Sequence, residues 1–113
     1  MIKTIEKPWG YEQIWAQTEK YVGKILHIKS GNRLSLQFHN IKEETVLVIS
    51  GTLSIECEDS ENPDIIIVEE NKSFHVLPKQ IHRFCAYDGD VTLVEVSTPE
   101  LEDVIRISDD YDR

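Results

Sequence analysis

Short runs of β-branched, aromatic and aliphatic residues recur roughly every 8 to 12 residues along this chain, separated by turn-forming residues. No long segment has helical periodicity. We expect strands at residues 11–15, 22–29, 33–38, 45–50, 52–58, 65–69, 73–77, 82–87 and 91–97, with a weaker one at 104–107. So many strands in 113 residues favour a closed, all-β barrel or jelly roll, because unpaired strand edges promote aggregation.

The length and the even distribution of strands predict a single domain over residues 1–113. Within it we distinguish an N-terminal strand segment (1–21), a core barrel (22–98) and an acidic C-terminal tail (99–113). The carboxylates of the tail are expected to form a solvated face.

The charge balance argues against two classes of partner. Twelve basic and 21 acidic residues give a net charge of -9, which would repel nucleic acid and anionic membrane surfaces. The chain has neither a membrane-spanning apolar stretch nor the apolar region of a signal peptide at its N-terminus, so we expect a cytoplasmic protein. Cys57 and Cys85 lack the spacing of a metal-binding or redox motif and are expected to be buried, reduced thiols.

A polar row follows one face of the strand expected at 33–38. Side chains alternate along a strand, so Arg33, Gln37 and His39 point to one side and the leucines between them to the other. Glu44 opens the next strand on a face that it shares with valines, which lets Gln37, His39 and Glu44 converge. Glu43 is the nearest substitute for Glu44, although the strand phase favours Glu44.

His82 begins a later strand after the turn at Pro78 and can join this cluster. Gln37, His39, Glu44 and His82 then offer nitrogen and oxygen ligands for one divalent metal, with a position open to water or substrate. Zinc suits these ligands best, and manganese, iron, cobalt and nickel are alternatives.

Five further residues are candidates for chemistry near this site. Arg33 can receive an anionic group of a substrate, and Lys42 and Arg106 are weaker candidates for the same role. Glu95 is a carboxylate on an apolar strand face and needs a partner there. It can either support the metal ligands or act as the general base. His75 can line the cavity as a proton shuttle or be purely structural.

Several motifs together resemble one known family. Gly31-x5-Gln37-x-His39-x4-Glu44-x6-Gly51 resembles the first cupin motif, and Pro78-x3-His82 resembles the second. The runs Lys7–Glu12, Gly23–Ile28, Arg33–Gln37, Glu70-Asn71-x-Ser73 and Asp103–Arg113 are similar to the isomerase domain of type II phosphomannose isomerases.

The resemblance implies a cupin jelly roll that holds one divalent metal, with Gln37, His39, Glu44 and His82 at the positions of the family's ligands. It also implies the interconversion of mannose 6-phosphate and fructose 6-phosphate, so that a sugar phosphate is the expected small-molecule partner. Ile41 and Lys42 stand where the family has a His and an Arg. That Arg is implicated in the isomerase reaction, and Lys42 keeps its charge without its planar fork.

Two other functions are consistent with the same residues. A cupin with these ligands can be a different metal enzyme, such as an iron dioxygenase, or a non-catalytic domain that binds a small carbohydrate. The apolar run Ile65–Val68 is suited to burial on both faces, and we expect a homodimer.

Overall fold

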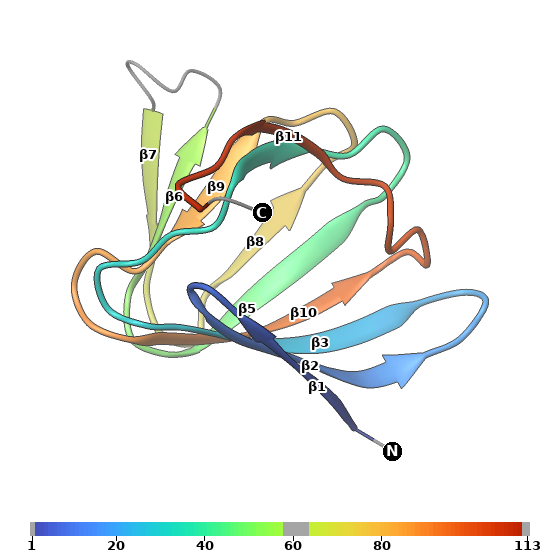
Figure 1. Ribbon diagram of the computed structural model, residues 1–113, viewed down its shortest axis with the longest axis horizontal. Coiled ribbons are helices and arrows are strands. Elements are labelled where there is room, and N and C mark those ends of the chain that lie inside the picture. Colours follow the sequence, from blue (N-terminus) through green and yellow to red (C-terminus); the bar gives the residue numbers. More distant parts are fainter. Residues whose placement is uncertain (1, 58–63, 112–113) are drawn as a thin grey trace.

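The computed structural model describes residues 2–57 and 64–111, and strands are its only regular elements there (Figure 1). The strands are β1 (Lys3–Lys7), β2 (Gly10–Gln17), β3 (Val22–Ile28), β4 (Leu36–Phe38), β5 (Glu44–Ser50), β6 (Leu53–Cys57), β7 (Asp64–Val68), β8 (Ser73–Val76), β9 (His82–Cys85), β10 (Val91–Ser97) and β11 (Ile105–Ser108). The all-β prediction is therefore confirmed. Within these residues there is no helix capable of crossing a membrane.

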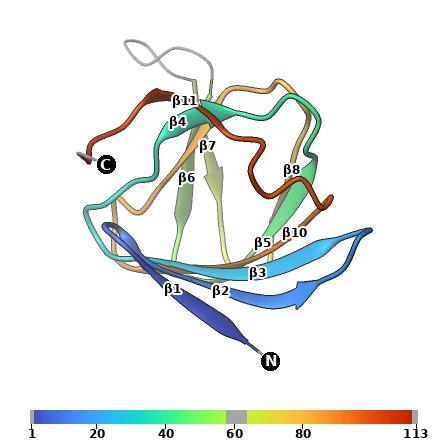
Figure 2. The same ribbon diagram turned by 45° about the vertical axis from the view of Figure 1, so that its right-hand side comes forward.

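Two antiparallel sheets face each other (Figures 1 and 2). The larger sheet has the order β1-β2-β3-β10-β5-β8, and the smaller has the order β11-β4-β9-β6-β7. Neighbours in each sheet are often distant in sequence, as β3 and β10 are, so the chain passes repeatedly from one sheet to the other. This arrangement brings the end of β4, the start of β5 and the start of β9 to the same end of the barrel.

The core lies between the sheets and is built by strand alternation. Along β10, Val91 and Leu93 are fully buried and Glu95 is buried on the same face, whereas Val96 is exposed. The other sheet contributes Leu53 and Ile55, which are also fully buried. Burial of such side chains contributes about 1.5–3 kcal/mol each. Cys57 and Cys85 are both buried, as expected.

The strand expected at 33–38 is shorter than predicted. Only Leu36–Phe38 is regular strand, and Arg33 forms an isolated bridge with Cys85. Residues 33–35 instead run beside β9 and are held to it by isolated backbone hydrogen bonds. One of these is donated by the Leu34 N–H to the Phe84 carbonyl. In the N-terminal segment, Lys3–Lys7 forms a strand that was not expected, paired with β2.

The acidic tail is largely exposed, and some of its carboxylates also bind the barrel. Its strand β11 pairs with β4, and Asp110 forms a two-bonded ion pair with Arg33. The carboxylate of Asp103 accepts backbone hydrogen bonds from the turn after β4. These acidic side chains therefore fasten the tail to the barrel.

Strand β7 lies at the edge of the smaller sheet, and its isoleucines are not buried on both faces within this chain. Ile65 and Ile67 are each more than half exposed, and Ile66 is 37% exposed. The homodimer expected from this run stays a prediction.

Gly51, in the turn between β5 and β6, provides a test of the backbone geometry. Its φ is +84°, and a Cβ there would lie 2.2 Å from the Asp90 carbonyl oxygen. Gly89 has a similar φ of +93° but open space around it. We expect Gly89→Ala to cost about 1–2 kcal/mol through φ alone, and Gly51→Ala to cost clearly more. Denaturant unfolding of both variants measures the difference, and equal losses would contradict the steric argument.

Candidate metal centre

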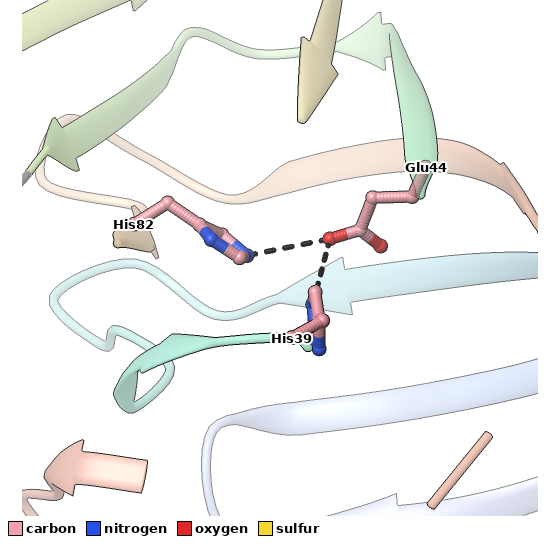
Figure 3. A group of neighbouring side chains, drawn as sticks. All are labelled: His39, Glu44 and His82. Atoms are coloured by element: carbon pink, nitrogen blue, oxygen red, sulfur yellow. Dashed lines mark hydrogen bonds and ion pairs between the residues drawn. The ribbon is translucent and has the colours of Figure 1, made fainter. Parts of the chain in front are cut away.

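Two histidines and a glutamate from three separate segments meet inside the barrel (Figure 3). His39 follows β4, Glu44 begins β5 and His82 begins β9, and all three are buried. The Glu44 Oε1 atom lies 3.2 Å from His39 Nε2 and 3.3 Å from His82 Nε2. One ligand atom from each residue lies within 4.8 Å of the others, which is close enough for a single metal ion.

Backbone carbonyls orient both imidazole rings. His39 Nδ1 lies 2.7 Å from the Asp103 carbonyl oxygen, and His82 Nδ1 lies 2.9 Å from that of Gln80. A carbonyl oxygen only accepts, so each Nδ1 carries the proton, and in a neutral ring Nε2 then presents its lone pair. This second contact is typical of metal-binding histidines.

The Nε2 atoms therefore direct their lone pairs toward a carboxylate. Among the described residues, His82 Nε2 is a buried atom without a hydrogen-bond partner. Such an atom is costly unless something compensates it. A divalent cation would satisfy both nitrogens and the Glu44 oxygen together, so these residues fit a metal ion.

A buried lysine lies beside this cluster. Lys42 Nζ is 3.6 Å from Glu44 Oε2 and 3.5 Å from Glu95 Oε2, and all three side chains are almost fully buried. Burial would raise the pKa of Glu44, but effects that include the positive charge of Lys42 hold it well below its usual range. Burial also lowers the pKa of Lys42, but its two carboxylate neighbours raise it by more, so Lys42 is a cation.

The pKa of Glu95 is shifted in the opposite direction from that of Glu44. Burial and the neighbouring charge of Glu44 raise the pKa of Glu95 to about 8, against the opposing effect of Lys42. Two carboxylates around one ammonium group thus have different proton affinities. Such a pair suits proton transfer, in which one group stays ionised and another changes its protonation.

A cavity of about 460 Å³ opens onto these groups. Glu44, Lys42, Glu95 and Gln37 line it, together with apolar residues such as Trp9. The two histidines contact Glu44 but are not among the described residues that line the cavity. Glu44 is therefore the member of the cluster that meets both the histidines and the cavity.

The structure brings together most of the site residues predicted from sequence. Gln37 is the register partner of His82, and its Oε1 accepts a hydrogen bond from the Ser35 hydroxyl. Arg106, the register partner of Gln37 on β11, also lines the cavity. Gln37 and Arg106 both lie on the wall of this cavity.

Arg33 lies elsewhere. Its guanidinium is bound to Asp110 through two nitrogens and contacts the Tyr87 hydroxyl, and Arg33 is absent from the described lining of the cavity. The face that Arg33 was expected to share with Gln37 is lost because the strand is irregular before Leu36.

His75 and Glu43 also lie outside the cavity. His75 Nε2 is hydrogen-bonded to the Glu43 carboxylate on the barrel surface, where each side chain is about half exposed. Glu44 points inward with Val46 and Val48, as the strand phase predicted, while Glu43 points away. His75 is therefore not placed to transfer protons inside the cavity.

Two groups at the site had no role in the sequence analysis. Lys7, Glu12 and Lys24 line the cavity on the larger sheet. Asp103 binds the turn between His39 and Glu44, accepting hydrogen bonds from three successive backbone N–H groups, those of residues 40–42. Alternation along β3 could have indicated Lys24, which shares its face with the buried Leu26 and Ile28. Asp103 carried no comparable signal, because its partners are distant backbone groups.

Comparison with known proteins agrees with this architecture. The family described as "Mannose-6-phosphate isomerase C-terminal" matches residues 1–109. The chain belongs to this family. The resemblance identified from the sequence motifs is thereby confirmed.

Relatives of this isomerase-family chain include two longer proteins. The alginate biosynthesis protein AlgA of Pseudomonas aeruginosa is 30% identical over 96% of the chain, and the mannose-1-phosphate guanylyltransferase ManC of Salmonella typhimurium is 31% identical over 100%. The chain spans only 23% and 24% of their respective lengths.

Solved structures show the fold of this family member. It superposes on the capsular polysaccharide assembling protein CapF of Staphylococcus aureus with a TM-score of 0.78 (18% identity, 96% of this chain and 34% of that one). For KdgF of Halomonas sp. the TM-score is 0.76 (16% identity, 89% and 91%). For a variant of the oxalate decarboxylase of B. subtilis it is 0.79 (16% identity, 94% and 30%). The chain is a cupin-type double-stranded β-helix, as predicted.

We expect the protein to bind one divalent metal through His39, Glu44 and His82. Metal at a hundredfold excess over its Kd should stabilise the wild type by about 2.7 kcal/mol. The His39→Ala/His82→Ala double variant should lose this gain, and His75→Ala should keep it. Elemental analysis and thermal unfolding with and without metal measure both effects. Equal metal content in wild type and double variant would contradict the assignment.

Asp103 should make stability depend on pH. The backbone hydrogen bonds of Lys42, Ile41 and Asn40 hold the pKa of Asp103 at about 2, below that of an unfolded aspartate at about 4. Because the folded-state pKa is the lower one, its stabilisation is complete at neutral pH and is lost as the pH falls from about 4 to about 2.

Asp103→Asn should therefore unfold more easily than wild type at pH 7, and the two should converge near pH 2. Asp88→Asn, in an exposed loop, serves as the control. Urea unfolding across this pH range is the measurement. A difference between wild type and Asp103→Asn that does not change with pH would show that the carboxylate charge is not responsible.

Proposed function

We propose that this chain is a metal-dependent sugar-phosphate isomerase that interconverts mannose 6-phosphate and fructose 6-phosphate. The observation that carries this proposal is the buried row Glu44–Lys42–Glu95, which joins a metal-binding cluster to a cavity large enough for a small metabolite. Membership of the isomerase C-terminal family supports it. In line with the sequence-based expectation, we place the activity in the cytoplasm.

The reaction requires a proton to move between neighbouring carbons. In the open-chain aldose, a base removes the proton on C2, and that electron pair forms the C1=C2 bond of an enediol as O1 gains a proton. A proton then returns to C1 while the hydroxyl on C2 loses its proton and becomes the ketone. No atoms are gained or lost, and no oxidant is needed.

Glu95 is suited to carry the proton between C2 and C1. Its carboxylate lines the cavity, and its raised proton affinity makes it a stronger base than an exposed glutamate. One carboxylate can serve both carbons because they are adjacent. Lys42, a cation held between Glu95 and Glu44, can donate hydrogen bonds to the two substrate oxygens and stabilise negative charge on them.

The metal would be held by His39, Glu44 and His82, with Gln37 as a further ligand facing the cavity. When bound, it polarises a substrate oxygen as a Lewis acid. Zinc best suits these ligands, and manganese, iron, cobalt and nickel are the alternatives. Glu95 is outside this proposed ligand set and would remain available for proton transfer.

Proton NMR of mannose 6-phosphate in deuterium oxide tests this function. Metal-loaded wild type should form fructose 6-phosphate and incorporate deuterium at the exchanging carbons. Glu95→Gln should lower kcat by about 10²- to 10⁴-fold and keep its metal, because it removes only the base. Glu69→Gln, an exposed substitution outside the cavity lining, is the matched control.

Three results would overturn the proposal. Neither product nor deuterium exchange with the metal-loaded wild type would exclude the isomerase. Turnover that consumes oxygen would identify a dioxygenase, and binding without turnover would identify a carbohydrate-binding domain.

A further inference from the structure

A second cluster of charged side chains lies in the cavity, on the strands of the larger sheet farthest from Glu44. Glu12 on β2 forms ion pairs with Lys24 on β3 and with Lys7 on β1, at 3.5 Å in the second case. Glu12 is 7% exposed, and its carboxylate holds both ammonium groups at the cavity wall. The metal cluster does not use any of these residues.

Strand register joins this cluster to the proposed catalytic groups. Lys24 is the direct cross-strand partner of Glu95, so the two side chains lie side by side on the cavity face. Glu44 is on β5, two strands beyond β3 in the order β3-β10-β5. The Lys24 ammonium group pairs with Glu12 on β2, on the side of β3 away from Glu95, and Lys7 lies one strand further, on β1. A ligand that runs across the sheet can therefore reach Glu95 with one end and these two ammonium groups with the other.

The cavity has a charge opposite to that of the whole chain. Among the described residues, its lining includes five of the chain's 12 basic residues but only four of its 21 acidic ones. The bases are Lys3, Lys7, Lys24, Lys42 and Arg106, and the acids are Glu12, Glu44, Glu95 and Glu102. Lys42 lies between the two carboxylates of Glu44 and Glu95, whereas Lys7 and Lys24 share the single carboxylate of Glu12. The part of the lining that contains Lys7 and Lys24 therefore keeps an excess of positive charge.

Arg106 extends this positive region to the smaller sheet. It is an exposed residue of β11 that lines the same cavity as the lysines of β1 and β3. Figure 2 shows β11 and β1 on opposite sides of the barrel. Both sheets therefore contribute positively charged side chains to the lining of this cavity. This suits a dianion with several acceptor oxygens.

The geometry points to a phosphate subsite formed by Lys7 and Lys24, with Arg106 opposite and Glu12 as the residue that positions both lysines. The identity of its ligand, the terminal phosphate of a hexose phosphate, rests on the proposed function. Binding there places the other end of the sugar toward Glu95 and Glu44, so this subsite sets which carbons react. An unphosphorylated sugar cannot make these ionic contacts and should bind more weakly.

The test separates binding from turnover. The probes are a hexitol 6-phosphate, which cannot isomerise, the same hexitol without phosphate, and inorganic phosphate, each titrated calorimetrically into metal-loaded protein. Wild type should bind the hexitol phosphate most tightly, inorganic phosphate more weakly and the plain hexitol least. Lys7→Gln and Lys24→Gln should each weaken binding of the hexitol phosphate about 10- to 100-fold, the cost of one charge-assisted hydrogen bond.

Controls exclude indirect effects. Lys72→Gln removes an exposed lysine outside the cavity lining and should bind like wild type. Lys7 is not a neighbour of Glu95, so its variant reports on the anion without disturbing the proposed base. If Lys24→Gln unfolds because Glu12 loses its partner, the Lys24→Gln/Glu12→Gln double variant replaces it. Thermal unfolding verifies that each variant is folded.

The outcomes distinguish this subsite from the isomerase proposal. Lysine-dependent binding of the hexitol phosphate without isomerisation of mannose 6-phosphate would support the subsite and overturn the isomerase. Isomerisation with an unchanged KM and unchanged binding in Lys7→Gln and Lys24→Gln would overturn the subsite alone. Equal affinity of wild type for the hexitol with and without phosphate would also overturn it.

Discussion

The buried carboxylate of Glu44 is the group on which the site depends. An ionised carboxylate inside a barrel is costly unless cations and hydrogen-bond donors surround it. Lys42 supplies one positive charge, with its Nζ atom 3.6 Å from Glu44 Oε2. The two imidazoles turn an unprotonated Nε2 toward Glu44, because each ring carries its proton on Nδ1. Glu44 therefore links the metal cluster behind it to the cavity in front, and substitution there would disturb both.

Strand alternation explains how charge reaches so far into the barrel. Glu12, Lys24 and Glu95 each share a strand face with buried aliphatic residues, and they lie on the adjacent strands β2, β3 and β10. Opposite charges on neighbouring strands compensate one another, which makes their burial tolerable. The apolar core occupies the rest of the same face, so one sheet both stabilises the barrel and provides the cavity wall.

The sequence was sufficient to predict the β-type fold and the convergence of His39, Glu44 and His82, because both follow from period-2 alternation and motif spacing. It was insufficient to predict where the Arg33 side chain lies, because the strand is irregular there and its guanidinium is bound by Asp110, a residue 77 positions away. The role of Asp103 was likewise hidden, since it depends on backbone groups brought close only by the fold. Long-range pairing, rather than local propensity, decided these cases.

The two departures from the family motif differ in their physical consequences. Ile41, at the position of a family His, is 66% exposed, so this replacement lies outside the metal cluster. Lys42, at the position of a family Arg, is buried with one nitrogen between two carboxylates at nearly equal distances. A compact ammonium group suits that position, whereas a planar guanidinium would need more room and would present several donors in one plane. The site thus accommodates Lys42 by bringing Glu44 and Glu95 around a single point charge.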